Sequence, residues 1–181
     1  SEAWKYTALR ALERRTFSHP DGGFSAFDPA LIAGIPAPRL VFVNGVHDPA
    51  QSDVSALPAG IELGVPQAIA SVPNTSPGTH DRSDEVFVRL NEALATTGVM
   101  LRVDAGIAVD TPVHLVFIGM PAGSDLAWHL RHDIELGERA SITLAEHHLA
   151  GGAHRHLDNA SLALRIGKQA QLRHARIQHA A

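Results

Sequence analysis

The chain has 181 residues, enough for one domain with a substantial core, and because it contains no cysteine it offers neither a disulfide framework nor thiolate ligands for zinc or an iron–sulfur cluster. Its net charge is −4 without a basic stripe, and no apolar run approaches the roughly 20 residues of a membrane span, so we expect neither nucleic-acid binding nor membrane insertion. Apolar residues make up 45% of the chain but aromatic ones only 5%, which favours a β-rich scaffold that is soluble and cytoplasmic.

Residues 1–97 are predicted to form an N-terminal region of helix, loop and hairpin. The segment Glu2–Phe17 predicts a short amphipathic helix, because its apolar residues recur at helical spacing. These apolar residues are Trp4, Ala8, Leu9 and Leu12. Glycine and proline punctuate His19–Ala37, and Val65–Arg82 is rich in Pro, Ser, Thr and Gly, so both segments predict loops.

A hairpin and a second helix are expected within the same region. Arg39–Val43 reads as a strand and ends at Asn44-Gly45, a pair that tolerates the positive φ angles of a tight turn. Further along, Ser83 or Asp84 can cap a helix that carries apolar residues at helical spacing. We expect that helix to end at Gly98.

Residues 98–181 are predicted to be entirely β, because short aliphatic runs alternate with turns and show no helical period. Their most informative feature is an internal repeat in which Asp133–Ile142 aligns with Ala163–Leu172, and we call the offset from Asp133 to Ala163 the repeat length. Each copy reads as a strand, a glycine-led turn and a second strand, with apolar side chains at alternate positions. The stretch Met100–Leu115 has a looser version of the same rhythm.

Such a repeat cannot bury its apolar face alone, so we expect it to stack on its neighbours as the coils of a β-solenoid do. The alternative, two ordinary hairpins of a β-sandwich, remains open from the sequence. A solenoid that stops just after a repeat exposes unpaired strand edges unless something caps them. We therefore expect residues 98–181 to be the first coils of a truncated core.

The histidines are the richest source of potential ligands, with nine of the twelve following Gly98. The densest group contains four of them beside an acidic residue, and imidazole and carboxylate groups are ligands for zinc, iron or manganese. The group consists of Glu146, His147, His148, His154 and His156. On a strand, His154 and His156 point to the same side, as do the first ligands of a cupin-type metal site.

Two features argue against such a site. A cupin supplies a glutamate a few residues after the second histidine, where this chain reads Leu157-Asp-Asn-Ala-Ser-Leu162. The neighbours His147 and His148 face opposite ways on a strand, so only one of them can join a cluster. We therefore expect solvent-facing histidines, assign no catalytic, cofactor-binding or metal-binding residue, and retain a cupin-like metal-dependent enzyme as the alternative function.

Other enzyme classes lack their motifs. The chain contains neither the Gly-x-Ser-x-Gly turn of a serine hydrolase nor a glycine-rich phosphate loop, and Gly167-Lys168 is not followed by Ser or Thr. Leu136–Ala140 and Ile166–Ala170 each resemble one turn of a hexapeptide acyltransferase, but they do not recur every six residues. Nucleotide hydrolysis and acyl transfer are thus not supported.

Several motifs in a fixed order, from Glu2 to Gln178, resemble the SufB/SufD family. In the first half they are Glu2-Ala-Trp-Lys-Tyr-Thr7, Val41-Phe-Val-Asn-Gly45, Leu57-Pro-Ala-Gly60 and Phe87–Leu94 followed by Gly98. In the second half they are Arg131–Gly137, Leu144-Ala-Glu146, Asn159 and Ile177-Gln178.

This resemblance implies a right-handed parallel β-helix preceded by a helical N-terminal region. It implies a non-catalytic scaffold subunit, without a cofactor of its own, in a complex with a SufB-like subunit and a SufC-like ATPase that assembles iron–sulfur clusters. Family members continue with further coils and a helical region, where the residues thought to act at the subunit interface lie, so no functional residue is carried over. Strand edges also offer a place for a related subunit, or a second copy, to add by pairing.

Overall fold

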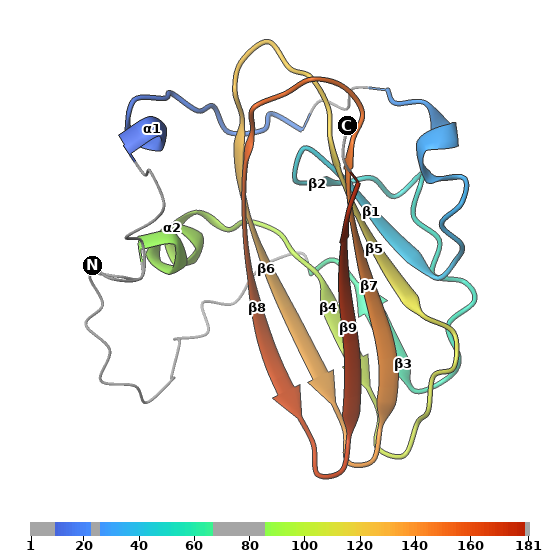
Figure 1. The fold of residues 1–181 in the computed structure, drawn as a ribbon. Helices are drawn as coiled ribbons and strands as arrows, with labels where there is room; N and C mark the ends of the chain where they lie inside the picture. Colours follow the sequence, from blue (N-terminus) through green and yellow to red (C-terminus); the bar gives the residue numbers. More distant parts are fainter. Residues whose placement is uncertain (1–9, 23–25, 67–85, 180–181) are drawn as a thin grey trace.

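The computed structural model describes residues 10–22, 26–66 and 86–179 and shows a mainly β protein (Figure 1). Two short helical segments and three strands precede a longer helix and six further strands. In chain order the first group is α1 (Arg10–Glu13), η2 (Pro29–Ile32), β1 (Arg39–Val43), β2 (Val46–His47) and β3 (Ile61–Gly64). The second group is α2 (Val86–Leu94), β4 (Met100–Val103), β5 (Val113–Gly119), β6 (Ala127–Leu136), β7 (Ser141–Ala150), β8 (Leu157–Ile166) and β9 (Gln171–Gln178).

The strands form two mixed sheets, and successive strands from β4 onward alternate between them. One sheet has five strands in the order β2-β1-β5-β7-β9, and the other has four in the order β3-β4-β6-β8. Strands β1, β5, β7 and β9 run parallel, as do β4, β6 and β8, whereas β2 and β3 lie antiparallel at one edge of each sheet. Strands β1 and β3, from the first predicted region, thus extend sheets that are built mainly by residues after 98. The boundary predicted between residues 97 and 98 stays a prediction.

The internal repeat sets the register of the last strands. Asp133 of β6 lies opposite Ala163 of β8, and Ile142 of β7 lies opposite Leu172 of β9, so each pair joins residues that are one repeat length apart. The repeat that the sequence predicted is therefore confirmed, because its two copies lie directly side by side in both sheets. Strands β6 and β7 belong to different sheets, so the alternative of two ordinary sandwich hairpins is wrong.

The close approach of neighbouring turns explains why each repeat turns at a glycine. Gly137 and Gly167 follow β6 and β8, and a Cβ on Gly167 would lie 2.7 Å from the backbone nitrogen of Glu138 in the neighbouring turn. Two residues after each glycine, Arg139 and Gln169 adopt φ angles of 60° and 59°. Both turns therefore contain a residue in the left-handed conformation at the same position, which lets the chain reverse its direction within a few residues.

The main hydrophobic core lies between the two sheets. Alternate side chains of the strands point inward, and the most deeply buried ones are at most 1% exposed. They include Leu101, Leu115, Leu130, Ile134 and Leu144. A second, smaller cluster covers the outer face of the five-stranded sheet, where Ile32 and Ile35 pack on β1 and β5. Each such aliphatic side chain contributes about 1.5–3 kcal/mol through its burial.

The helical N-terminal region expected from the sequence is not confirmed. Residues 1–9 of the predicted helix Glu2–Phe17 lie outside the described residues, and α1 ends at Glu13. Beyond it the chain forms β-type pairing, because Ser18 N donates to Asp125 O at 2.9 Å and Ala127 N donates to Ser18 O at 3.0 Å. The loop predicted before β1 contains the short helix η2.

The hairpin and the second helix agree better with the prediction. Asn44 and Gly45 join β1 to β2 with φ angles of 48° and 78°, which confirms the tight turn. The predicted loop and helix cap between residues 67 and 85 lie outside the described residues. Helix α2 ends at Leu94, four residues before the end expected at Gly98. Gly98 instead lies against β6, where a Cβ would overlap the carbonyl oxygen of Arg131.

Helix α2 is held on the outer face of the four-stranded sheet by polar contacts. Asn91 is 1% exposed, and its side-chain amide donates to the carbonyl oxygens of Leu130 at 2.7 Å and Asn159 at 2.9 Å. Its own oxygen accepts a hydrogen bond from Ser161 Oγ at 2.7 Å. Both ends of this buried amide are used across the interface, which fixes where the helix sits on β6 and β8.

Candidate functional site

The structure places His154 and His156 in the loop before β8 and gives both of them structural roles. Leu126 N donates to His156 Nδ1 at 2.9 Å, so His156 carries its proton on Nε2 and donates it to Met120 O at 2.7 Å. His154 Nδ1 donates to Gly152 O at 2.9 Å, and its ring stacks on that of His156 with centroids 4.8 Å apart. Both nitrogens of His156 are thus engaged by the backbone, which disfavours the cupin-type metal site.

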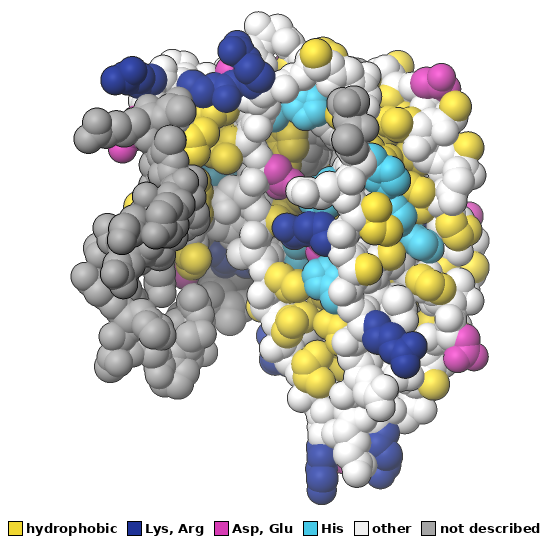
Figure 2. Space-filling view, in the orientation of Figure 1, with side chains coloured by type: hydrophobic (Ala, Val, Ile, Leu, Met, Phe, Trp, Pro, Cys, Tyr) yellow, Lys and Arg dark blue, Asp and Glu magenta, His cyan; other side chains and the backbone are white. Residues whose placement is uncertain are grey.

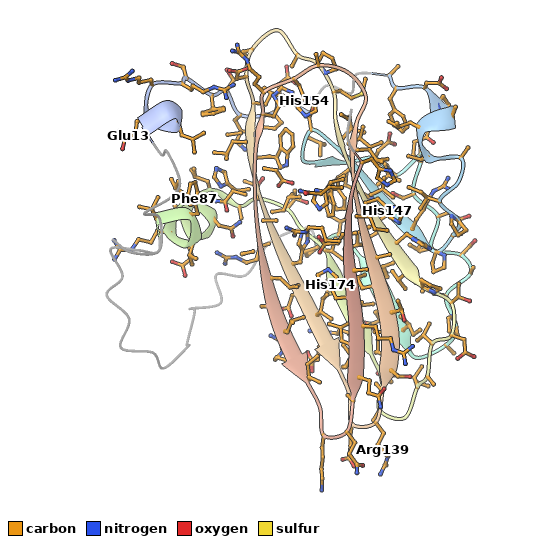
Figure 3. The ribbon with its side chains drawn as sticks, in the orientation of Figure 1. Glu13, Phe87, Arg139, His147, His154 and His174 are labelled. Carbon is orange, nitrogen blue, oxygen red and sulfur yellow. The ribbon has the colours of Figure 1, made fainter. Side chains whose placement is uncertain are left out.

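His147 and His148 face opposite sides of β7, as the alternation of a strand predicts. His147 lies on the outer face, where its Nε2 is 3.0 Å from Nδ1 of His114, and its ring stacks on that of His179 at 6.0 Å (Figure 3). The remaining nitrogens, His114 Nε2 and His147 Nδ1, are buried without a hydrogen-bond partner among the described residues. Burial lowers the pKa of both rings, so both are neutral at pH 7.

On the inner side of the strands lies a group of charged and titratable side chains that we call the interior polar cluster. It consists of Glu146 and His148 of β7, Asp158 of β8, and His174 and Arg176 of β9. Glu146 continues the inward series of β7 and lies opposite Arg176, again one repeat length further along the chain. The cluster therefore occupies core positions of the repeat at one end of the hydrophobic core.

Glu146 is the centre of this cluster. Its side chain is 3% exposed, and it accepts from Arg176 Nε at 2.8 Å, from His174 Nε2 at 2.9 Å and from His148 Nε2 at 3.3 Å. Burial alone would raise the pKa of Glu146, but the hydrogen bonds of His148 and Arg176 and the neighbouring positive charge lower it to about 2. Glu146 is thus a carboxylate over the whole neutral range.

Two further titratable groups surround Glu146. Asp158 Oδ2 lies 3.6 Å from His148 Nδ1, and burial raises the pKa of Asp158 although the histidine opposes this. His132 of β6 accepts from Val99 N at 3.1 Å, and burial lowers its pKa to about 4 despite the nearby carboxylate of Glu146. A buried neutral histidine beside a buried carboxylate indicates a polar interior built from hydrogen bonds.

Arg176 completes the cluster at its open side. Its side chain is 53% exposed, and only its Nε is used within the described part of the chain, by Glu146. Figure 2, which looks onto β8 and β9, shows charged and histidine side chains at the centre of this face, with hydrophobic side chains below them. The arrangement holds a guanidinium group in a fixed orientation at the surface, which suits it to bind a carboxylate.

Sequence reasoning singled out Glu146 and His148 but missed Asp158, His174 and Arg176. The repeat contained a signal for two of them, because His174 and Arg176 stand one repeat length after the inward positions Leu144 and Glu146. Asp158 had no such signal, since the matching position on β6 is Trp128. The five members of the cluster come from three strands and meet only through the stacking of β7, β8 and β9.

One cavity, of about 260 Å³, lies on another part of the molecule, between the segment at His19, the turn before His47 and the start of β6 at His129. Burial lowers the pKa of His47 and His129, and each of these rings has one nitrogen engaged, by Ser52 Oγ and by Asn159 respectively. Within the described ranges, no group of three or more His, Asp or Glu side chains is arranged to hold a metal ion. None of the helices in those ranges is long and apolar enough to cross a membrane.

No family model matches the chain. The iron–sulfur cluster assembly protein SufD of Escherichia coli is 30% identical over 179 residues, which cover 97% of this chain and 41% of that protein. An iron–sulfur cluster assembly SufBD family protein of Synechocystis sp. is 25% identical over 194 residues, covering 98% of this chain and 42% of that protein.

The chain thus spans about two fifths of the length of the curated relatives it matches. The similarity extends from the N-terminal region through β9, so it includes both the hairpin of β1 and β2 and the stacked repeat. It agrees with the resemblance seen in the sequence motifs, from Glu2 to Gln178. On this evidence, the chain is a relative of the SufB/SufD family.

Proposed function

We propose that this chain takes part in iron–sulfur cluster assembly as a non-catalytic scaffold subunit in the cytoplasm. The observation that carries this proposal is the 30% identity to SufD over 97% of the chain. The relative is described as an iron–sulfur cluster assembly protein, and the similarity covers nearly the whole chain, including the two sheets.

We further propose that the sheets are the first coils of a right-handed parallel β-helix. The support is the alternation of successive strands between two sheets, together with the same repeat length separating register partners in β6–β8 and in β7–β9. Parallel strands joined by crossovers are right-handed in nearly all proteins. A stack of this kind gives a rigid surface, which suits a scaffold better than a moving catalytic site.

The residues of the interior polar cluster support a structural role. Both oxygens of Glu146 accept hydrogen bonds from within the cluster, and the carboxylate is held charged. A general acid or base needs a pKa near the working pH, and that of Glu146, at about 2, is far below it. Glu146 is therefore better placed to orient its neighbours than to transfer protons.

The partners in this proposal are a SufB-like subunit and a SufC-like ATPase. These 181 residues contain no cysteine and no phosphate-binding loop, so in this proposal the sulfur ligands for a cluster and ATP hydrolysis come from outside them. The iron–sulfur cluster is then the product of the complex and is not a cofactor of this chain.

The test is co-purification of the tagged chain with SufB-like and SufC-like proteins, with iron and zinc measured on the same samples. We expect the partners to be retained and the chain alone to hold less than one metal ion per molecule. Failure to retain the partners, together with one tightly bound ion lost on substituting His154 and His156 by alanine, would instead favour the metal-dependent enzyme.

A further inference from the structure

The cavity of about 260 Å³ lies where four separate segments of the chain meet. They are the segment at His19, the hairpin turn before His47, the stretch between α2 and β4 at Thr97, and the start of β6 at His129. None of the described residues that line the cavity belongs to β8 or β9, the last two strands. The cavity is therefore walled by parts of the chain that are far apart in the sequence, and it is a product of the fold.

One wall of the cavity is fixed by the packing of Trp128 against the hairpin turn. Trp128 is 7% exposed, and a Cβ on Gly45 would lie 2.4 Å from the Cβ and Cγ atoms of that side chain. The indole ring also meets the ring of His156 edge-on, with centroids 5.4 Å apart. Because the indole is held on two sides, this wall is present before any ligand arrives, and binding need not order it.

His129 supplies the cavity with a hydrogen-bond donor. Asn159 Nδ2 donates to Phe87 O at 2.8 Å and lies 2.9 Å from His129 Nδ1, and because an amide nitrogen only donates, His129 Nδ1 accepts. Burial lowers the pKa of His129, which is 9% exposed, so at pH 7 the ring is neutral and carries its proton on Nε2. That N–H has no acceptor in the described part of the chain, so His129 can present it to the cavity.

His47 supplies a hydrogen-bond acceptor. Ser52 Oγ donates its proton to Asp48 O at 2.7 Å, so it can only accept from His47 Nε2, which lies 3.1 Å away. Burial lowers the pKa of His47 although the charge of Asp48 opposes this, so the ring is neutral at pH 7. With the proton on Nε2, the lone pair of Nδ1 is left without a donor among the described residues.

The size and charge of the cavity restrict what it can hold. Among the described residues that line it there is no Asp, Glu, Lys or Arg, and Pro20, Val46 and Trp128 present apolar surface to it. A charged ligand would lose its hydration there without gaining an opposite charge. The volume is below the roughly 300–1,000 Å³ of pockets for drug-sized molecules, which suits a single ring with one substituent.

We propose that this cavity binds a small, flat, uncharged molecule of the aromatic carboxamide class, with its ring beside Trp128, its carbonyl oxygen accepting from His129 Nε2 and its amide group donating to His47 Nδ1. A carboxamide has both an acceptor and a donor and carries no charge, which matches the two histidines. No partner protein contributes to the site, so it can be tested separately from the proposed scaffold role.

The test is titration of the chain with benzamide and, separately, with benzoate, which has nearly the same shape but is negatively charged at pH 7. Binding is followed by titration calorimetry. His129→Phe and His47→Phe each remove the ring nitrogens and keep an aromatic ring. His179→Phe is the matched control, because His179 does not line the cavity and stacks on His147 on the outer face of the five-stranded sheet. Far-UV circular dichroism confirms that each variant is folded, and His47→Phe decides the outcome if His129→Phe does not fold.

We expect benzamide to bind with a dissociation constant of about 1 mM or tighter, and benzoate to bind at least about tenfold more weakly. Each cavity variant should bind benzamide at least about fivefold more weakly, and His179→Phe should change the dissociation constant by less than about twofold. Absence of benzamide binding at about 10 mM, or equal binding of benzamide and benzoate, would overturn the proposal. Unchanged binding by the folded cavity variants, or an equal loss in His179→Phe, would also overturn it.

Discussion

Replacing Glu146 by glutamine removes the charge at the centre of the interior polar cluster while nearly preserving its shape. The pKa of Glu146 falls from 4.5 to about 2 on folding, and at about 1.4 kcal/mol for each pH unit the charged form stabilises the fold by about 3 kcal/mol. Because the side chain of Arg176 is 53% exposed, solvent screens part of its interaction with Glu146. We therefore expect Glu146→Gln to lower the free energy of unfolding by about 1–3 kcal/mol at pH 7.

The assay is guanidinium unfolding followed by circular dichroism, at pH 7 and at a series of lower pH values. Because the pKa of Glu146 is lower in the folded state, its contribution is complete above pH 4.5 and is lost as the pH falls toward 2. Glu146→Gln should therefore be less stable than the parent at pH 7 and should lose less stability on acidification.

The matched control is Glu138→Gln, which also removes one carboxylate from an ion pair, with Arg139 at 3.3 Å, but at a turn where the side chain is 49% exposed. We expect that variant to lose less than about 0.5 kcal/mol. Equal losses for the two variants, or an unchanged acid response of Glu146→Gln, would refute the reasoning that Glu146 is a charged, paired and buried group.

Three further outcomes are expected. The pKa of His132 falls from 6.5 to about 4 on folding. The stability that its neutral form contributes is therefore complete above pH 6.5 and is lost as the pH falls toward 4. Unfolding of His132→Gln across this range should show up to about 3 kcal/mol less acid destabilisation than the parent. Gly98→Ala places a methyl group against the carbonyl oxygen of Arg131 and should lower the melting temperature by several degrees or prevent folding. Gly123 has open space around it, so Gly123→Ala should leave the melting temperature within about two degrees of the parent's. Asn91→Ala removes the buried amide that holds α2 together with its three hydrogen bonds to Leu130, Asn159 and Ser161. Urea unfolding should therefore show a loss of about 1–3 kcal/mol, and a loss below about 0.5 kcal/mol would contradict this role.

Local rules were sufficient to predict the parts of the fold that depend on neighbouring residues or on the repeat. The turn at Asn44-Gly45 follows from the φ angles that these two residues tolerate. The match of Asp133–Ile142 with Ala163–Leu172 indicated the register of four strands, because residues one repeat length apart are those that stack in the sheets.

Contacts between distant segments explain what the sequence did not predict. The helix α1 ends at Glu13, and the chain beyond it pairs through Ser18 with Leu126, just before β6 and far along the chain. Gly98 looked like the end of a helix, but its small size is needed for its approach to Arg131. In both cases the neighbouring residue lies in a segment far away in the sequence, where no local pattern indicates it.

The candidate site shows the same limit. His154 and His156 drew attention as a metal-binding pair, but the backbone of a neighbouring loop uses both nitrogens of His156. Arg176, which the sequence did not single out, becomes important only because β9 lies beside Glu146 of β7. Side chains that meet across paired strands of the repeat can be found from a sequence once the repeat length is applied position by position.

The most direct measurement of the scaffold proposal is the amount of iron–sulfur cluster formed by SufB-like and SufC-like proteins with iron, sulfide and ATP, as this chain is added. We expect cluster formation, followed by visible absorption, to rise with the amount of chain and to saturate at one chain per SufB-like subunit. The unsubstituted chain, shown to be folded by circular dichroism, should act in this way although it supplies no cysteine ligand. Cluster formation that does not change at any amount of added chain would contradict the proposal.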